Sequence, residues 1–218
     1  MEKRELNGLQ YLVKYPENFC GAKKYPMIFF LHGVGSCGDT FEKLEKNPYF
    51  LNGLTDRFIT YAPLCNSVSW FDLFEHLKAL LEFAANEKYV DDERIYGMGA
   101  SMGGYGIWQL AMSVPEYFAA IVPICGGGMY WSAYRLKNVP IWAFHGEDDE
   151  VVLCRESVKM TEAVNSCGGT AKLTVCQGVA HNSWDSVYNN ESVFDWLLEN
   201  KRKIHLNCEN KYDEKNFG

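Results

Sequence analysis

A G-x-S-x-G pentapeptide at residues 99–103 is the feature that most constrains this chain. The preceding residues 94–98, RIYGM, have a β-type composition, and a helical pattern follows. A serine held on so tight a strand-to-helix turn needs glycine two positions away on each side, because larger side chains would clash there. The context predicts that Ser101 presents its hydroxyl on such a turn as a nucleophile. Read out of context, the pentapeptide fits a turn with a capping serine equally well.

A serine hydroxyl is inert without a base and an acid that orients the base. Residues 140–144 have the pattern of a short buried strand, and they run into an acidic loop, HGEDDEVV, at 145–152. Residues 171–176 alternate like a last strand, and His181 follows in a loop before the final helix. We therefore predict His181 as the general base. Chemistry alone leaves three candidates for the acid: Glu147, Asp148 and Asp149.

Strand and helix patterns alternate along the chain. Further strands are expected at residues 9–13, 26–31, 58–62 and 118–125. Helices are expected from an N-cap at Asp72 to about Lys88, from 101 to 113, around 160–167 and around 193–197. The unbroken apolar run at 26–31 is typical of a strand buried on both faces of a parallel sheet. The prediction is an α/β fold with a mostly parallel twisted sheet and helices on both faces.

Length and composition limit the number of domains and the kinds of partner that this chain can have. With 218 residues, 47% of them hydrophobic, it fits one compact domain over 1–206, followed by a polar tail at 207–218. The net charge of −7 and the lack of a basic cluster beyond 201–203 argue against a nucleic-acid partner. The start of the chain has no signal-like apolar core and no run is long enough to span a bilayer, so a cytoplasmic protein without a membrane partner is expected.

Eight cysteines are too few, in a chain of this length, for a disulfide scaffold. They include no C-x-x-C pair, and several fall inside expected strands or helices. We therefore expect free thiols.

Two backbone amides are predicted to form an oxyanion hole. One belongs to Met102, directly after the nucleophile, and the other to Val34, in the glycine-containing loop after the strand at 26–31. We interpret His32, in the same loop, as a hydrogen-bonded strut and not as a catalytic group.

Four ordered motifs carry a resemblance to a known family. They are GASMGGYG at 99–106 with Trp108, FAAIVPICGGG at 118–128, PIWAFHG at 140–146 with Asp149, and GVAH at 178–181 with Trp184. Together they resemble the small esterase branch of the α/β-hydrolase superfamily over residues 9–198. Its members are often labelled prolyl-oligopeptidase-like or predicted peptidases, and they neighbour the feruloyl and phospholipase/carboxylesterase families.

The resemblance implies a single α/β-hydrolase domain in which Asp149 is the acid, with Asp148 second. Glu147 and Glu150 are then a solvated acidic rim. A calcium site in this acidic cluster is the other interpretation, which the absence of D-x-D-x-D spacing disfavours. No metal or organic cofactor is implied. The chain departs from many of these relatives at residues 36–37, where Ser-Cys replaces an acidic-basic pair, so substrate contacts are not carried over there.

The resemblance implies a serine carboxylesterase with a Ser-His-Asp triad and a small-molecule ester substrate, short-chain or aryl, including feruloyl or acetyl esters derived from plant polysaccharides. Residues 126–139 are too few for a helical cap, so an open, shallow site is expected. Trp70, Trp131 and Trp184 are predicted to contact substrate as an aromatic rim. A peptidase and an inactive binding module are the alternatives. The lack of a propeller domain argues against the first, and intact Ser101, Asp149 and His181 argue against the second.

Overall fold

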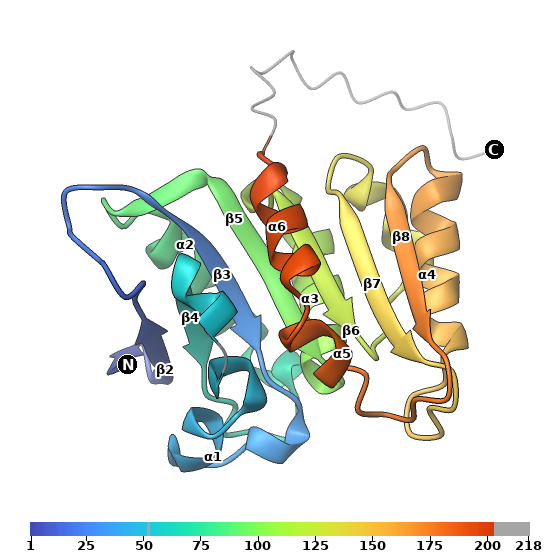
Figure 1. Cartoon of the computed structure of the whole chain (residues 1–218), viewed down its shortest axis with the longest axis horizontal. Coiled ribbons are helices and arrows are strands. Elements are labelled where there is room, and N and C mark those ends of the chain that lie inside the picture. The colour runs from blue at the N-terminus through green and yellow to red at the C-terminus, as the bar shows by residue number, and fades with distance from the viewer. Residues whose placement is uncertain (52, 203–218) are drawn as a thin grey trace.

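The computed structural model describes residues 1–51 and 53–202, which form one sheet with helices packed on both sides (Figure 1). The eight strands are β1 (Glu2–Leu6), β2 (Leu9–Lys14), β3 (Tyr25–Leu31), β4 (Ile59–Pro63), β5 (Val90–Ala100), β6 (Ala120–Ile124), β7 (Ile141–Gly146) and β8 (Ala171–Cys176). The α-helices are α1 (Glu42–Glu45), α2 (Phe74–Ala85), α3 (Met102–Ser113), α4 (Arg155–Ser166), α5 (Asp185–Tyr188) and α6 (Glu191–Glu199). The predicted α/β class is confirmed.

The strands lie in the order β1-β2-β4-β3-β5-β6-β7-β8. From β4 to β8 all neighbours are parallel, whereas β1 and β2 are antiparallel to their neighbours. β1 was not predicted, because its side chains are largely exposed and polar and give no apolar pattern. Asn7 and Gly8 join it to β2 with φ angles of 51° and 85°, which suit a two-residue hairpin turn.

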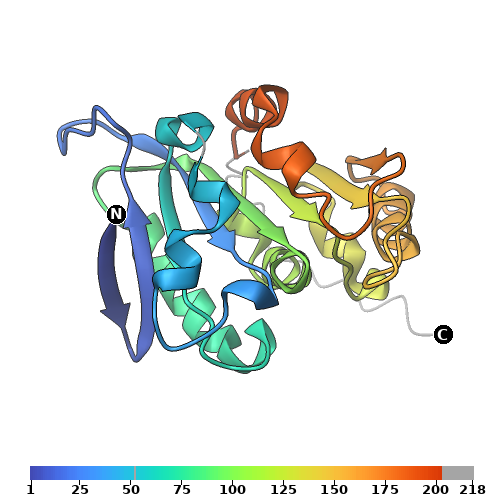
Figure 2. The same ribbon diagram turned by 60° about the horizontal axis from the view of Figure 1, so that its bottom comes forward.

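Successive side chains of the central strands enter two separate cores. On β3, Met27 and Phe29 pack toward α2, α3 and α4, while Ile28 and Phe30 pack toward α1, α5 and α6. This division explains the unbroken apolar run, since both faces of the strand are buried. Figures 1 and 2 show α6 and α5 on the face opposite α2 and α3.

Two local predictions need correction. The predicted N-cap at Asp72 is wrong: a 3₁₀ turn, η4 (Trp70–Leu73), precedes α2, and the Ser69 hydroxyl caps it by accepting a 3.0 Å bond from the Phe71 N–H. Ser69 is the cap in place of Asp72 because its extended backbone directs the hydroxyl at that amide. The helix also ends at Ala85, before Lys88.

The connection between β6 and β7 contains only the short 3₁₀ helix η6 (Tyr130–Leu136), so the expected absence of a cap holds for this segment. Five further 3₁₀ segments are η1 (Val34–Ser36), η2 (Pro48–Leu51), η3 (Gly53–Arg57), η4 and η5 (Pro115–Tyr117). The predicted tail at 207–218 lies outside the described residues. Within those residues, no helix combines the length and apolar character needed to cross a bilayer.

The start of α3 is in unusually close contact with the ends of two strands. A Cβ placed on Gly103 would lie 1.9 Å from the Leu31 carbonyl oxygen of β3, and one on Gly104 would lie 2.5 Å from the Ile124 oxygen of β6. One on Gly99 would meet the Gly103 oxygen at 2.4 Å. The glycines of the motif are therefore required by contacts with neighbouring backbone, which cannot move as a flexible side chain can.

Gly103→Ala should lower the free energy of unfolding by about 3 kcal/mol or more, because the added methyl group overlaps strand backbone. Urea unfolding at neutral pH measures the change. Gly21→Ala is the control, since nothing lies within 4 Å of a Cβ at that position. Equal stability of the two variants would contradict this account of the packing.

Candidate active site

Ser101 occupies the sharp turn between β5 and α3. Its φ of 57° and ψ of −119° fall outside the regions that L-residues favour. The Ser101 N–H donates to the Ile124 carbonyl at 2.9 Å, and its own carbonyl accepts from Tyr105 at 3.1 Å, so the strained residue is fixed from both sides. Strain of this kind persists where surrounding contacts determine it, and it concentrates at functional sites.

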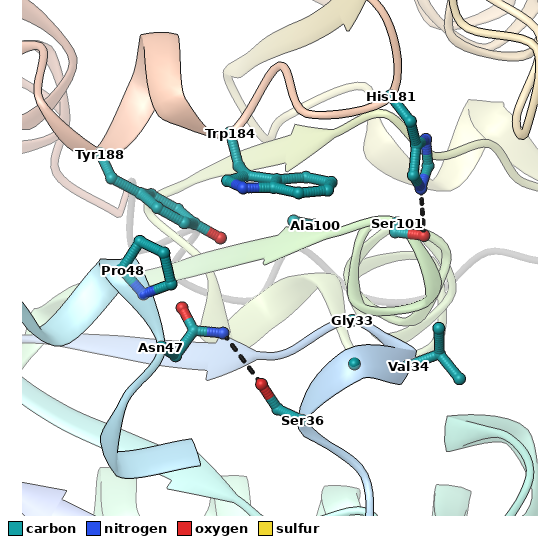
Figure 3. A pocket seen from close by; sticks show the side chains of 11 residues that line it. Gly33, Val34, Ser36, Asn47, Pro48, Ala100, Ser101, His181, Trp184 and Tyr188 are labelled. Atoms are coloured by element: carbon teal, nitrogen blue, oxygen red, sulfur yellow. Dashed lines mark hydrogen bonds between the residues drawn. The ribbon is translucent and has the colours of Figure 1, made fainter. Parts of the chain in front are cut away.

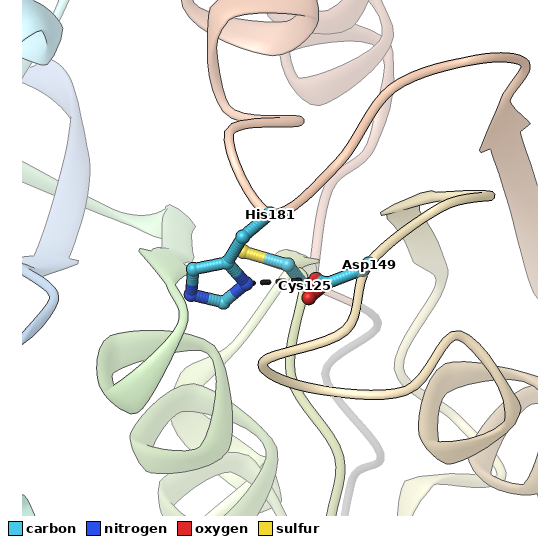
Figure 4. Close-up of side chains that lie close together, drawn as sticks. All are labelled: Cys125, Asp149 and His181. Carbon is cyan, nitrogen blue, oxygen red and sulfur yellow. Dashed lines mark hydrogen bonds and ion pairs between the residues drawn. The ribbon is translucent and has the colours of Figure 1, made fainter.

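Ser101, His181 and Asp149 form a continuous hydrogen-bonded chain. The Ser101 Oγ lies 2.8 Å from His181 Nε2 (Figure 3), and His181 Nδ1 lies 2.7 Å from Asp149 Oδ2 (Figure 4). Because a carboxylate oxygen only accepts, Nδ1 carries the hydrogen and Nε2 of the neutral ring is left to accept from the serine hydroxyl. The structure thus brings the three predicted residues together, with the His181 ring oriented toward the Ser101 hydroxyl.

Asp149 is 3% exposed, whereas Glu147, Asp148 and Glu150 are exposed. Its Oδ1 accepts from the backbone N–H groups of Val151 and Val152, each at 2.9 Å. Burial by itself would raise the pKa of Asp149, but its hydrogen bonds with His181 and these amides outweigh burial and hold the pKa below its usual range. Of the acidic loop, Asp149 is therefore the carboxylate that contacts His181.

The loops after β7 and β8 pack closely against each other and bring Asp149 and His181 into contact. A Cβ on Gly146 would lie 2.0 Å from the Ala180 oxygen, so only glycine lets the segment before His181 lie over the start of the acidic loop. His145, which the sequence reasoning did not single out, places Nε2 at 2.8 Å from the Val152 carbonyl and 3.3 Å from Asp149 Oδ2. Both neighbours are acceptors, so this nitrogen carries a hydrogen and helps to fix the carboxylate.

Cys125 lies behind the acid and base, and the ligand atoms of Cys125, Asp149 and His181 are within 4.8 Å of one another (Figure 4). A metal would need the thiolate, yet burial raises the pKa of Cys125 to about 12. It would also need the carboxylate oxygen that already accepts from His181. These donors fit a histidine–carboxylate pair with a thiol packed against it better than they fit a metal site.

The two predicted amides flank the nucleophile. Met102 is the first residue of α3, so its N–H has no partner within the helix and lies at the positive end of the helix dipole. Val34 begins the 3₁₀ turn η1. The preceding Gly33 is directly beside the serine, since a Cβ there would lie 3.5 Å from Ser101 Cβ. Val34 lines the same cavity as Ser101, and Met102 follows Ser101 directly, while the role of the two amides as an oxyanion hole stays a prediction.

His32 is the strut that the sequence indicated. It is fully buried, its Nδ1 lies 2.7 Å from the Gly33 carbonyl, and its Nε2 accepts from the Cys65 N–H at 3.1 Å. Burial lowers the pKa of His32 to about 4, so the ring is neutral at physiological pH. Trp70 supports the same loop by donating from Nε1 to the His32 carbonyl at 2.9 Å.

The three predicted aromatic contacts have different positions. Trp70 is 0% exposed, so its predicted place on a substrate-facing rim is wrong; its ring packs edge-on against His32. Trp131 is 66% exposed on η6 and packs against Tyr130, but it does not line the cavity beside Ser101. Trp184 does line that cavity, with its ring 5.4 Å from and nearly perpendicular to the His181 ring.

The cavity beside Ser101 has a volume of about 290 Å³. Its walls come from the loop after β3, the α1–η2 segment, and the segment that carries His181 and α5 (Figure 3). The residues that line it are Gly33, Val34, Gly35, Ser36, Asn47, Pro48, Ala100, Ser101, His181, Trp184 and Tyr188. Sequence reasoning missed Asn47, Pro48 and Tyr188, because no local pattern connects them to the motifs.

Comparison with known proteins agrees with this fold. A model of the prolyl oligopeptidase family matches residues 72–137. A protein named probable feruloyl esterase C from Aspergillus terreus (strain NIH 2624 / FGSC A1156) is 24% identical over 166 residues, which are 72% of this chain and 61% of that protein. Probable dipeptidyl-peptidase 5 from the same organism is 26% identical over 62% of this chain and 20% of its own length.

A crystal structure of a thermostable esterase superposes with a TM-score of 0.77 and 30% identity, over 92% of this chain and 62% of the other. The chain thus spans about three fifths of the length of both the feruloyl esterase relative and this esterase. The fold is that of an α/β hydrolase, and the chain is similar to proteins of the prolyl-oligopeptidase-like esterase branch.

Asp149→Asn should slow covalent labelling of Ser101 by a fluorophosphonate by a factor on the order of 10³ to 10⁴, because an amide can hold the imidazole in the wrong tautomer. Asp148→Asn is the matched control and should label at the unaltered rate, since the Asp148 side chain is exposed. Rates come from intact-protein mass spectrometry over time. Equal loss in both variants would remove Asp149 from this role.

The stability of the protein should depend on pH through His32. Its pKa of about 4 in the folded state is below the ordinary value of 6.5, so the unfolded chain binds more protons between these values. Stability is therefore fully present above about pH 6.5 and is lost as pH falls toward 4, with a slope of up to about 1.4 kcal/mol per pH unit. His32→Gln should remove this part of the slope, as measured by urea unfolding at several pH values. An unchanged slope would contradict the assignment.

Proposed function

We propose that this protein is a serine carboxylesterase that hydrolyses short-chain or aryl esters through an acyl-serine intermediate. The observation that carries the proposal is the chain of hydrogen bonds from Ser101 Oγ through His181 to Asp149, beside a cavity that can admit a substrate. The esterases among its relatives support the same class of reaction.

In the first half of the reaction, His181 Nε2 accepts the Ser101 proton as Oγ attacks the ester carbonyl carbon. The carbonyl oxygen becomes an oxyanion, to which the Val34 and Met102 N–H groups donate. Asp149 stabilises the imidazolium that forms, and its lowered pKa keeps it ionised. The imidazolium then gives its proton to the departing alcohol oxygen, which leaves an acyl-serine.

In the second half, the same histidine accepts a proton from water as the water oxygen attacks the acyl carbonyl. A second oxyanion forms at the same two amides. Its collapse breaks the bond to Ser101 Oγ, the serine regains a proton from His181, and the carboxylic acid is released. Every proton is transferred by groups of the chain or by water, so the proposed reaction uses no metal or organic cofactor.

A peptidase is the second candidate, because the family model and the dipeptidyl-peptidase relative come from peptidases. Amide hydrolysis needs the same hydrogen bonds together with stronger protonation of the leaving group and an extended substrate site. Matched ester and amide substrates with one acyl group separate the two activities: higher turnover of the amide would favour the peptidase. A binding module without activity would neither react with a fluorophosphonate nor hydrolyse either substrate.

We also propose a cytoplasmic location, on the basis of the cysteines. Each of the seven within the described residues is a free thiol, as expected from the sequence, and Cys208 lies outside those residues. Unpaired cysteines on the surface, such as Cys20 and Cys167, fit a reducing compartment.

Ser101→Ala should lower kcat/KM for acetyl or butyryl esters by a factor on the order of 10⁴ or more, because the attacking oxygen is lost. The assay compares acetyl, butyryl, octanoyl and feruloyl esters. Ser186→Ala, which removes an exposed hydroxyl outside the cavity, is the control and should retain full activity. If the Ser101→Ala protein turned over esters at the original rate, the proposed mechanism would be wrong.

A further inference from the structure

The cavity beside Ser101 has a polar end that the proposed mechanism does not use. Tyr188, on α5, is 2% exposed and lines the cavity, and Figure 3 shows its hydroxyl pointing into the space between Trp184 and Asn47. Among the described residues, no hydrogen-bond partner of this hydroxyl is found. The hydroxyl is open to the cavity, so a ligand bound there can supply a hydrogen bond that none of the described protein groups makes.

Two further polar side chains lie at the same end. The Asn47 Nδ2 donates to the Ser36 Oγ at 3.2 Å, and the Asn47 Oδ1 accepts from the Tyr49 N–H at 3.0 Å. The Ser36 hydroxyl hydrogen is not used in either bond. Ser36 and Tyr188 therefore each have a hydroxyl group with capacity for a ligand oxygen, while Asn47 holds the wall in place.

The position of His181 indicates which part of an ester enters this cavity. In the proposed reaction the leaving oxygen receives its proton from His181 Nε2, so that oxygen must lie within hydrogen-bond distance of this nitrogen. His181 and Trp184 are three residues apart and both line the cavity, with Tyr188 one further turn along. An alcohol group that continues from the leaving oxygen would pass along Trp184 toward the Tyr188 hydroxyl (Figure 3).

We propose that the cavity binds the alcohol portion of the ester and that Tyr188 selects alcohols bearing further hydroxyl groups, of the size of one sugar ring. This inference rests on the proposed esterase function and names the substrate class of the same site. In this arrangement the C–H groups of the sugar ring pack against the Trp184 indole. One hydroxyl of the sugar forms a hydrogen bond with Tyr188, and a second forms one with Ser36. A volume of about 290 Å³ accommodates such a ring.

The test uses two acetates that both place a six-membered ring one methylene from the ester oxygen. They are a methyl glucoside acetylated at its primary hydroxyl, and cyclohexylmethyl acetate, whose ring has no hydroxyl. Tyr188→Phe should lower kcat/KM for the sugar ester about tenfold relative to the cyclohexylmethyl ester, because one hydrogen bond to the hydroxylated alcohol is lost. The variant should fold normally, since its ring keeps its contacts with Phe30 and Tyr49. Tyr134→Phe, which removes an exposed hydroxyl outside the cavity, should change neither rate.

A second matched pair, ethyl 4-hydroxycinnamate and ethyl cinnamate, carries the extra hydroxyl on the acyl portion. If Tyr188→Phe acts on this pair and not on the acetates, the cavity binds the acyl portion and the proposal is wrong. Equal losses for both acetates, or no loss for either, would also overturn it, although Ser101-dependent hydrolysis would still support the esterase function.

A direct binding measurement tests the inference even if the protein hydrolyses no ester. That lack of hydrolysis would contradict the proposed esterase function and not the sugar-binding subsite. Methyl glucoside is titrated into the Ser101→Ala protein with tryptophan fluorescence as the signal. Addition of Tyr188→Phe to that protein should weaken binding severalfold if the subsite exists. Identical titration curves with and without the Tyr188 hydroxyl would overturn the subsite.

Discussion

Close backbone contact between the start of α3 and the carboxyl ends of β3 and β6 determines most of this site. The contact is possible only because Gly103 and Gly104 have no side chain to place against the carbonyl oxygens of Leu31 and Ile124. It fixes Ser101 in its strained conformation, aims the first amide of the helix at the space beside the serine, and brings the loop after β3 alongside it.

The contact between Asp149 and His181 depends on a second close approach, between the loops after β7 and β8. Gly146 lets the backbone before His181 lie against the acidic loop, and His145 and two backbone amides fix the Asp149 carboxylate there. The buried carboxylate stays ionised because these donors together outweigh the cost of burial. Ser101 and His181 are thus positioned by two separate parts of the sheet, and in each part a glycine allows close backbone contact.

The aromatic residues near the site perform different tasks that composition does not distinguish. Trp70 is part of the interior and supports the loop that carries the Val34 amide, whereas Trp131 lies on the surface. Trp184 and Tyr188 come from one short segment after the catalytic base candidate and form the cavity wall. Tyr188 gains its proposed importance from its surroundings, because its largely buried side chain turns a hydroxyl, which has no partner among the described residues, toward the cavity.

Several features followed from the sequence alone. Alternation of apolar strands and amphipathic helices specified the α/β class, and the spacing of the pentapeptide specified the turn at Ser101, because these patterns reflect contacts among near neighbours in the chain. The acid was not determined in this way: Glu147, Asp148 and Asp149 are chemically alike, and only the resemblance favoured Asp149 before the structure showed which one contacts His181. The polar β1, the Ser69 cap, the buried position of Trp70 and the inward hydroxyl of Tyr188 were decided by tertiary structure, since burial and partnership depend on segments that are distant in sequence and meet only when the sheet assembles.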